Sequence, residues 1–231
     1  MFDGKNKAIT FSYDDGVTQD RRLIEIFDKF GLKATFNLNS ELLGQSEELV
    51  RNGVRVNHTK NSSKEVKEIY KNHEVAAHTL THPLLTRLSD EEIIYQVETD
   101  RKNLEKLTER TVTGMAYPGG GVNYNEHIAD VIRKNTGIMY ARTTVSSYNF
   151  ELQTDLLAFK PTVYHHQDWN KMIELGKEFI ELKTSEPKIM YIWGHSYEFD
   201  INDSWGAFED FCRLISGKSD IFYGTNAEVL L

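Results

Sequence analysis

Short apolar segments alternate with longer amphipathic segments along most of this 231-residue chain. Ala8–Phe11 has the residue types of a strand, and Asp20–Phe30 places apolar side chains on one side of a helix that Gly31 would end. Because strands and helices keep alternating, the pattern favours a parallel sheet with helical crossovers. Further strands are predicted at 33–38, 74–77, 115–117, 139–142, 156–159, 188–193 and 220–223, and further helices at 62–71, 89–107, 126–134, 168–182 and 204–215.

Two details refine this prediction. The helices 62–71 and 89–107 each begin at a serine that is followed three residues later by a glutamate, which is the capping-box pattern. No glycine-rich phosphate fingerprint follows the first strand, which disfavours a dinucleotide-binding sheet. We therefore expect a (β/α) barrel, an α/β fold.

Composition excludes several classes of protein. The chain has 27 Lys and Arg against 35 Asp and Glu, a net charge of −8 that argues against nucleic-acid or anionic-membrane partners. The single cysteine, Cys212, excludes an internal disulfide framework and is expected in the core. No apolar run reaches the roughly 20 residues of a membrane span. Residues 1–7 contain no apolar leader segment, which predicts a cytoplasmic protein. The oligomeric state leaves no mark in the sequence.

Reactive side chains follow the predicted strands at the point where each strand ends. Asp14-Asp15-Gly16 follows the first strand, and His78 to His82 follows the strand 74–77. Tyr117-Pro118-Gly119 and Trp193-Gly194-His195 end two later strands. Because barrel active sites are built from the C-terminal ends of the strands, we expect these side chains to share one rim.

The residue types at this rim are typical of a metal site. Two carboxylates facing one pocket repel each other and favour a cation, and Gly16 permits the turn that brings both to the rim. Pro83 disfavours a helix at His82, so we expect a loop on which His78 and His82 converge. Two imidazoles and a carboxylate bind divalent metals with positions left open for water. Taken singly, Asp-Gly is also a common turn, and these histidines, like His58, His73 and His127, are equally typical of structural roles.

His195 is a candidate general acid or base because it ends a buried strand at the same rim. Asp168 and Glu198 are candidate carboxylates to keep it protonated. A lone histidine after a buried strand is also common in purely structural roles.

These segments resemble the motifs of the polysaccharide deacetylase family, whose members are metal-dependent carbohydrate esterases. They occur in the family's order and span most of the chain. The aspartate pair and the His-Thr-x-x-His segment are specific together, whereas the three later segments are weak alone. The matching segments are Ser12–Gly16, His78–His82, Ala116–Pro118, Asp168–Trp169 and Trp193–His195.

The resemblance implies a distorted (β/α) barrel with fewer than eight complete units, and we expect residues 1–231 to form a single catalytic domain. It implies hydrolysis of an N-acetyl group on a saccharide, which releases acetate and a free amino sugar. The implied cofactor is a divalent metal, with Zn²⁺ expected and Co²⁺, Ni²⁺ or Mn²⁺ also compatible with the donor set.

The resemblance also implies a role for each matching residue. Asp14 would be the general base, and the metal ligands would be Asp15, His78 and His82. The backbone N–H of Gly119 would stabilise the oxyanion. His195 would be the general acid oriented by Asp168, and Tyr117 and Trp169 would bind the substrate.

One position departs from the family pattern. Ala116 stands where the family has the arginine that pairs with the base aspartate. We hypothesise that Arg142, at the end of a later predicted strand, supplies the missing guanidinium to Asp14.

Three other functions stay open at this point. One is an amidohydrolase that acts on a small non-polymeric amide. A second is a carbohydrate-binding protein without catalysis, which the missing arginine and the lack of a leader segment would allow. A non-haem iron oxygenase with the same two-histidine-one-carboxylate set ranks last.

Overall fold

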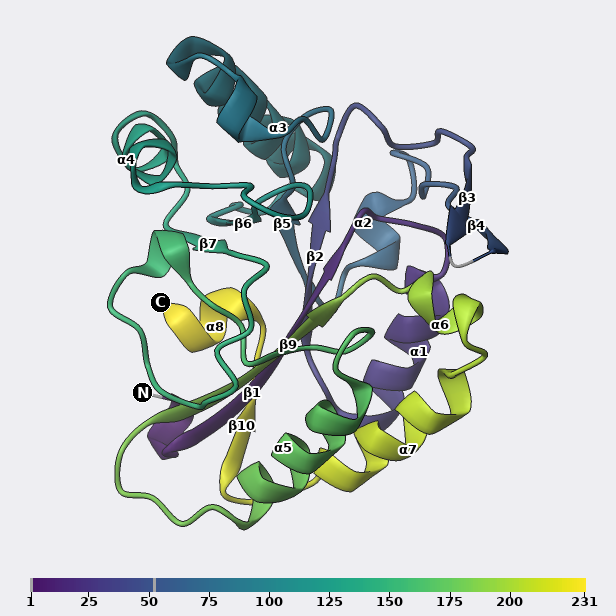
Figure 1. The fold of residues 1–231 in the computed structure, drawn as a ribbon, viewed down its shortest axis with the longest axis vertical. Helices are drawn as coiled ribbons and strands as arrows, with labels where there is room; N and C mark the ends of the chain where they lie inside the picture. The colour runs from purple at the N-terminus through teal and green to yellow at the C-terminus, as the bar shows by residue number, and fades with distance from the viewer. Residues whose placement is uncertain (1, 52) are drawn as a thin grey trace.

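The computed structural model describes residues 2–51 and 53–231, and its centre is an eight-stranded sheet with every neighbouring pair parallel. The strand order is β7-β6-β5-β2-β1-β9-β8, with β10 also paired to β1. Figure 1 shows these strands at the centre of the molecule, with helices around them. The strands are β1 Lys7–Asp14, β2 Ala34–Leu38, β5 Glu74–Ala77, β6 Gly114–Ala116, β7 Tyr140–Arg142, β8 Val163–Tyr164, β9 Lys188–Gly194 and β10 Ile221–Tyr223.

The sheet curls into an incomplete barrel. Strand β1 pairs with β9 along one edge, while its other edge pairs first with β10 at Lys7–Ile9 and then with β2 at Phe11–Asp14. Beyond β7 the chain folds back, and Arg142 forms an isolated parallel bridge with Phe159. This architecture confirms the predicted distorted α/β barrel with fewer than eight complete strand–helix units.

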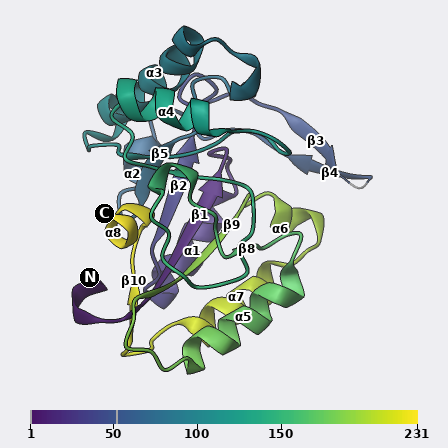
Figure 2. The ribbon, with the colours of Figure 1, turned by 60° about the vertical axis from the view of Figure 1, so that its left-hand side comes forward.

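Helices cover the outside of the sheet (Figure 1). Helix α7 packs against both α1 and α5, and α3 packs against α4. A separate antiparallel hairpin, β3 Glu48–Arg51 with β4 Val54–Asn57, projects from the body of the molecule (Figure 2). The helices are α1 Asp20–Phe30, α2 Val66–Ile69, α3 Asp90–Thr108, α4 Glu126–Asn135, α5 Trp169–Glu181, α6 Glu198–Ile201, α7 Trp205–Ile215 and α8 Asn226–Leu230, with 3₁₀ turns η1 Phe2–Gly4, η2 Leu85–Arg87 and η3 Leu156–Ala158.

The two faces of β1 show how the barrel is packed. All eight of its residues are buried, as expected for a parallel strand that is covered on both sides. Ile9, Phe11 and Tyr13 belong to the main core, where α1 and α7 pack. Because side chains alternate along a strand, Ser12 and Asp14 point to the opposite face, the inside of the barrel. Cys212 lies in the main core, as predicted.

Two predicted elements are wrong. Residues 62–71 form a helix only at Val66–Ile69, because the preceding residues form a turn in which the Glu65 N–H donates to the Ser62 carbonyl. The predicted strand 156–159 is the 3₁₀ turn η3, whose start is capped by Asp155. Most other elements are confirmed to within a few residues. In α3, Ser89 and Glu92 form the predicted capping box.

Across residues 2–51 and 53–231, the structure contains no helix with the length and apolar character needed to cross a membrane.

Candidate functional site

Two neighbouring aspartates face one site because the chain turns sharply at the end of β1. Asp14 is the last residue of β1, and Asp15 and Gly16 then adopt φ values of 81° and 64°. This left-handed region is uncommon for a residue with a Cβ, so it marks Asp15 as a specially held position. The positive φ of Gly16 favours glycine, and a Cβ there would also displace the Leu38 side chain, whose Cδ2 would lie only 2.7 Å away.

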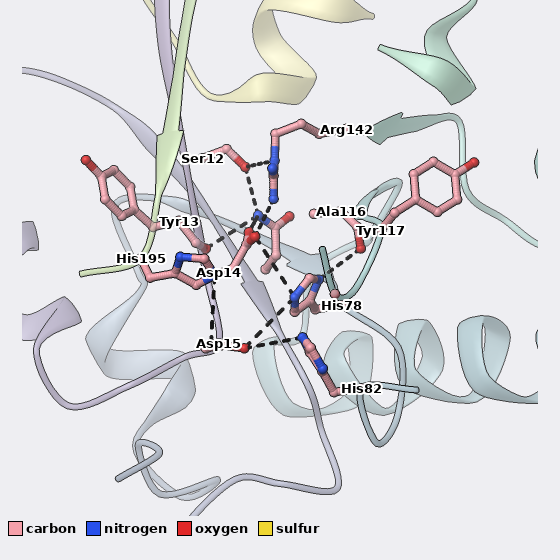
Figure 3. A network of polar contacts seen from close by, with 12 residues as sticks. Ser12, Tyr13, Asp14, Asp15, His78, His82, Ala116, Tyr117, Arg142 and His195 are labelled. Carbon is pink, nitrogen blue, oxygen red and sulfur yellow. Dashed lines mark hydrogen bonds and ion pairs between the residues drawn. The ribbon is translucent and has the colours of Figure 1, made fainter. Parts of the chain in front are cut away.

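The Asp14 carboxylate is held by donors from two other strands (Figure 3). Arg142 of β7 donates from Nη2 to Asp14 Oδ2, and Asn37 of β2 donates to Oδ1 at 2.8 Å. Both donors also bond to Ser12 Oγ, Arg142 at 3.2 Å and Asn37 at 2.8 Å. Arg142 is only 1% exposed and Asp14 only 3%, so this is a buried ion pair. The structure therefore places the Arg142 guanidinium at Asp14, where the hypothesis put it.

The second aspartate lies beside the two histidines of the His-Thr-x-x-His segment. Asp15 Oδ1 is 3.9 Å from His78 Nε2 and 3.8 Å from His82 Nε2. Three potential ligand atoms, one from each residue, lie within 4.8 Å of one another. The segment is a loop, as predicted, with positive φ at Thr79 and His82.

These three residues suit a divalent metal. A tetrahedral zinc site with bonds of about 2.1 Å spaces its ligand atoms by roughly 3.4 Å, close to the separations seen from Asp15 Oδ1. The His78 Nδ1–H donates to the Ala116 carbonyl at 2.9 Å, which leaves Nε2 as the lone-pair nitrogen facing Asp15. Burial lowers the pKa of His78 to about 4, so at neutral pH its imidazole is in the uncharged form that binds metals.

Two buried groups hold the loop of the histidines in place. The Asp100 carboxylate of α3 accepts the backbone N–H groups of His78 at 3.0 Å and Ser40 at 2.7 Å. Asn39 donates to the carbonyls of His78 and Thr79 at 2.5 Å and 2.8 Å. Helix α3 and the end of β2 thus fix the backbone that carries both imidazoles.

His195 lies on the side of Asp15 that is opposite to His78 and His82 (Figure 3). Its partner carboxylate is Glu198. His195 Nδ1 lies 3.1 Å from Glu198 Oε1, and its backbone N–H donates to Glu198 Oε2 at 2.9 Å. Glu198 also contacts His165 at 3.0 Å and accepts the Tyr164 hydroxyl. Burial by itself would lower the pKa of His195, but Glu198, with Asp15 and Asp14, raises it to about 9. The imidazole is therefore charged at neutral pH.

Asp168 does not take the position that the motif implied. Its carboxylate accepts the Tyr148 hydroxyl at 3.0 Å instead of contacting His195. The reason is local, because Asp168 immediately precedes α5, whereas Glu198 is three residues after His195 at the start of α6 and folds back on it. The spacing of three residues between His195 and Glu198 was therefore a usable sequence signal for this contact.

The site opens into a cavity of about 530 Å³. Gly119, with φ 80°, lines this cavity together with the acidic and histidine residues. Tyr117 also borders this cavity, but it is 1% exposed and its hydroxyl donates to the Leu157 carbonyl at 2.8 Å, so most of its ring is packed inside the protein. Figure 3 shows that ring directed away from the aspartates.

Trp169 also departs from the expectation that it lines the main groove. It packs against the main core and borders a neighbouring cavity of about 270 Å³, which shares His166 and Glu198 with the larger one. As the first residue of α5, its ring lies on the helix side that faces the core.

Sequence reasoning missed two residues that contact Asp15. His58 Nε2 lies 3.0 Å from Asp15 Oδ2, and Lys60 Nζ lies 3.6 Å from Asp15 Oδ1. Neither belongs to a motif, and isolated histidines and lysines carry no spacing signal. Asn37, which contacts Asp14, was also missed, although a polar residue in a buried strand needs a partner and is in itself a usable signal.

The model of the polysaccharide deacetylase family matches residues 3–140. A mutant of a carbohydrate esterase family 4 pseudoenzyme with restored enzymatic activity has a TM-score of 0.62 at 18% identity, covering 99% of this chain and 68% of that chain. The wild-type pseudoenzyme is from Bacillus anthracis, and this chain spans 66% of its length. No curated protein matches the sequence.

Two further solved structures are similar over nearly the whole chain. A family 4 carbohydrate esterase from Streptomyces lividans, in complex with acetate, has a TM-score of 0.58 at 16% identity and covers 96% of this chain and 93% of that chain. A family 4 acetyl xylan esterase from Clostridium thermocellum, in complex with a cobalt ion, has a TM-score of 0.60 at 13% identity and covers 96% and 89%.

The incomplete parallel barrel thus has the fold of the family 4 carbohydrate esterases. More than half of the sequence matches the family model, from Asp3 to Tyr140. The chain belongs to the polysaccharide deacetylase family.

Proposed function

We propose that residues 1–231 form one catalytic domain that hydrolyses an N-acetyl group on a saccharide in a metal-dependent reaction. The observation that carries the proposal is that the two neighbouring carboxylates have different partners. Asp14 is paired with Arg142, while Asp15 faces His78 and His82. Family membership supports carbohydrate deacetylation as the reaction class.

Asp15, His78 and His82 would hold the metal. When bound there, a divalent ion supplies a Lewis acid that polarises a carbonyl and acidifies a water molecule. The mixed nitrogen and oxygen donor set suits Zn²⁺ and also accepts Co²⁺, Ni²⁺ or Mn²⁺. The cobalt ion in the acetyl xylan esterase makes Co²⁺ a sensible second metal for tests.

Asp14 acts as the general base that accepts a proton from the attacking water. Arg142 and Asn37 each take one of its two oxygens, and each oxygen keeps a further lone-pair position for the incoming proton. Arg142 replaces, from β7, the arginine that the family pattern places at Ala116. The loss of the family arginine is thereby compensated by a residue on a neighbouring strand.

His195 acts as the general acid that gives a proton to the departing amine. Its raised pKa, about 9, keeps the imidazole protonated at neutral pH, and Glu198 is the carboxylate that holds it. The backbone N–H of Gly119 stabilises the oxyanion of the acetyl group, an interaction whose removal costs about 3–4 kcal/mol in related chemistry.

The test is acetate release from N-acetylglucosamine oligomers by purified protein loaded with Zn²⁺ or Co²⁺. N-acyl amino acids and cyclic amides serve as comparison substrates. We expect acetate from the oligomers and its loss after chelation, restored by adding the metal back. Turnover of only the small amides would indicate an amidohydrolase, and binding of the oligomers with no acetate release would indicate a non-catalytic relative. Either result would overturn the proposal.

A further inference from the structure

The two oxygens of the Asp15 carboxylate have different surroundings. Oδ1 faces the His78 and His82 imidazoles, as Figure 3 shows, whereas Oδ2 lies 3.0 Å from His58 Nε2. His58 is 7% exposed and Asp15 is 8% exposed, so this contact is shielded from water.

The His58 ring is fixed on its other side as well. Its Nδ1 lies 3.0 Å from Glu47 Oε2, and its backbone N–H donates to the Glu47 carbonyl at 2.8 Å. The ring also packs edge-on against Tyr197, with centroids 5.0 Å apart. Glu47, His58 and Asp15 therefore form a chain of polar contacts that ends at the candidate metal site.

The segment that carries His58 is attached directly to the turn that follows Asp15. The Asn61 N–H donates to the Gly16 carbonyl at 2.8 Å, and the Thr18 N–H donates to the Thr59 carbonyl at 2.9 Å. Asn61 also donates from its side chain to the Val17 carbonyl at 2.8 Å. Because these bonds tie both sides of the contact together, His58 is held at a fixed place beside Asp15.

We propose that His58, oriented by Glu47, is a positioning residue that holds Asp15 so that only Oδ1 is presented to the metal. The inference rests on the proposed function, since it concerns the same metal site. A carboxylate that is free to rotate can offer either oxygen or both. A donor on Oδ2 removes that freedom, and loss of such outer partners typically weakens metal binding 10- to 100-fold.

Lys60 lies beside the same carboxylate, but its charge should weaken metal binding where His58 should strengthen it. Its ammonium lies 3.6 Å from Oδ1, the oxygen that faces the histidines, and 3.4 Å from His58 Nε2. The Lys60 side chain is only 5% exposed, so water screens its charge poorly. The positive charge of Lys60 therefore repels a metal ion that binds at Oδ1. Removing Lys60 should tighten metal binding, and removing His58 should weaken it.

The experiment measures the Zn²⁺ dissociation constant by competition with a chromogenic chelator. We expect H58A to bind Zn²⁺ about 10- to 100-fold more weakly and H58Q, whose amide can still donate, to recover part of the loss. K60M should bind Zn²⁺ more tightly, by roughly tenfold. H127A is the matched control, because His127 forms an exposed imidazole–carboxylate contact with Asp90 at 2.7 Å and should leave the constant unchanged.

The opposite directions of the two changes make the test decisive. A purely structural role for the segment would weaken Zn²⁺ binding in both H58A and K60M, and that result would overturn the proposal, as would an unchanged constant in H58A. Thermal unfolding in the presence of chelator identifies a variant that fails to fold, in which case H58Q carries the test. Wild-type acetate release is measured separately. Metal binding without acetate release therefore refutes the proposed function while leaving the His58 measurement interpretable.

Discussion

The reactive side chains Asp14 and His195 are each held by charged or polar partners. Arg142 and Asn37 reach Asp14 from β7 and β2, and Glu198 folds back on His195 from the start of α6. These contacts are buried, so the charges interact in surroundings that screen them poorly. The partners therefore contribute to the stability of the fold, and Glu198 also raises the pKa of His195.

The buried Asp14–Arg142 pair predicts a large stability effect. Replacing Arg142 by methionine leaves a buried carboxylate without its counter-charge, which we expect to lower the free energy of unfolding by about 3–5 kcal/mol. Urea denaturation of the metal-free protein measures this change. The double variant D14N/R142M should be more stable than R142M, because no unpaired charge remains. A double variant whose loss is the sum of the two single losses would contradict this explanation.

The Glu198 contact predicts a change in the pH dependence of activity. Since Glu198 raises the pKa of His195 to about 9, activity should fall as the pH rises through that region and the imidazolium loses its proton. In E198Q the negative charge is gone, so the pKa of His195 drops and the alkaline limb moves toward neutral pH. A metal at Asp15 would lower the pKa in both proteins and leave the direction of this change the same.

The variant D168N is the control for this prediction. Asp168 contacts Tyr148 and not His195, so the profile of D168N should overlay that of the wild type. The measurement is kcat/KM for acetate release between pH 6 and pH 10, a range set around the pKa of His195. A shifted limb in D168N together with an unshifted limb in E198Q would favour the assignment that the motif implied.

At the residue scale, the sequence predicted the reactive side chains of the site better than the residues that contact them. The Asp14, Asp15, His78 and His82 cluster was recognisable because its members lie in two short motifs. Arg142 was the one partner of Asp14 that the departure from the family pattern indicated. Asn37 was not predicted, because its contact with Asp14 depends on the pairing of β1 with β2. His58 had no signal at all, since it reaches Asp15 from the loop after β4.

At the scale of elements, the two serine–glutamate pairs make a matched comparison. Ser89 accepts the Glu92 N–H and starts α3, whereas the Ser62 side chain takes no part in capping α2, which begins at Val66. We expect S89A to lower the free energy of unfolding by about 1 kcal/mol. S62A should leave it within about 0.5 kcal/mol of the wild type. Chemical denaturation measures both, and equal losses in the two variants would contradict the assignment.

Elements were predictable where local signals agreed with packing. Helix α1 and strand β5 match the predicted bounds, because their apolar spacing and flanking residues point to the same structure. The 62–71 segment failed because only Val66 of α2 is buried, which gives a longer helix little to pack against. The β3–β4 hairpin was missed because its strands are largely exposed and show no clear alternation.

At the scale of the whole molecule, the barrel explains why distant motifs meet. Parallel strands bring their C-terminal ends to one rim, so residues from Asp14 to His195 converge without any sequence proximity. The fold class followed from strand–helix alternation. The strand order and the return of the chain after β7 did not, because they depend on which strands pair across long distances.

The central claim is that Asp14 is the general base while Asp15 is a metal ligand. It is tested most directly by measuring bound Zn²⁺ and acetate release from N-acetylglucosamine oligomers on the same samples of wild type and D14N. We predict equal Zn²⁺ content and a fall in acetate release by a factor on the order of 10²–10⁴ in D14N. Loss of the metal from D14N, or acetate release at the wild-type rate, would contradict the account.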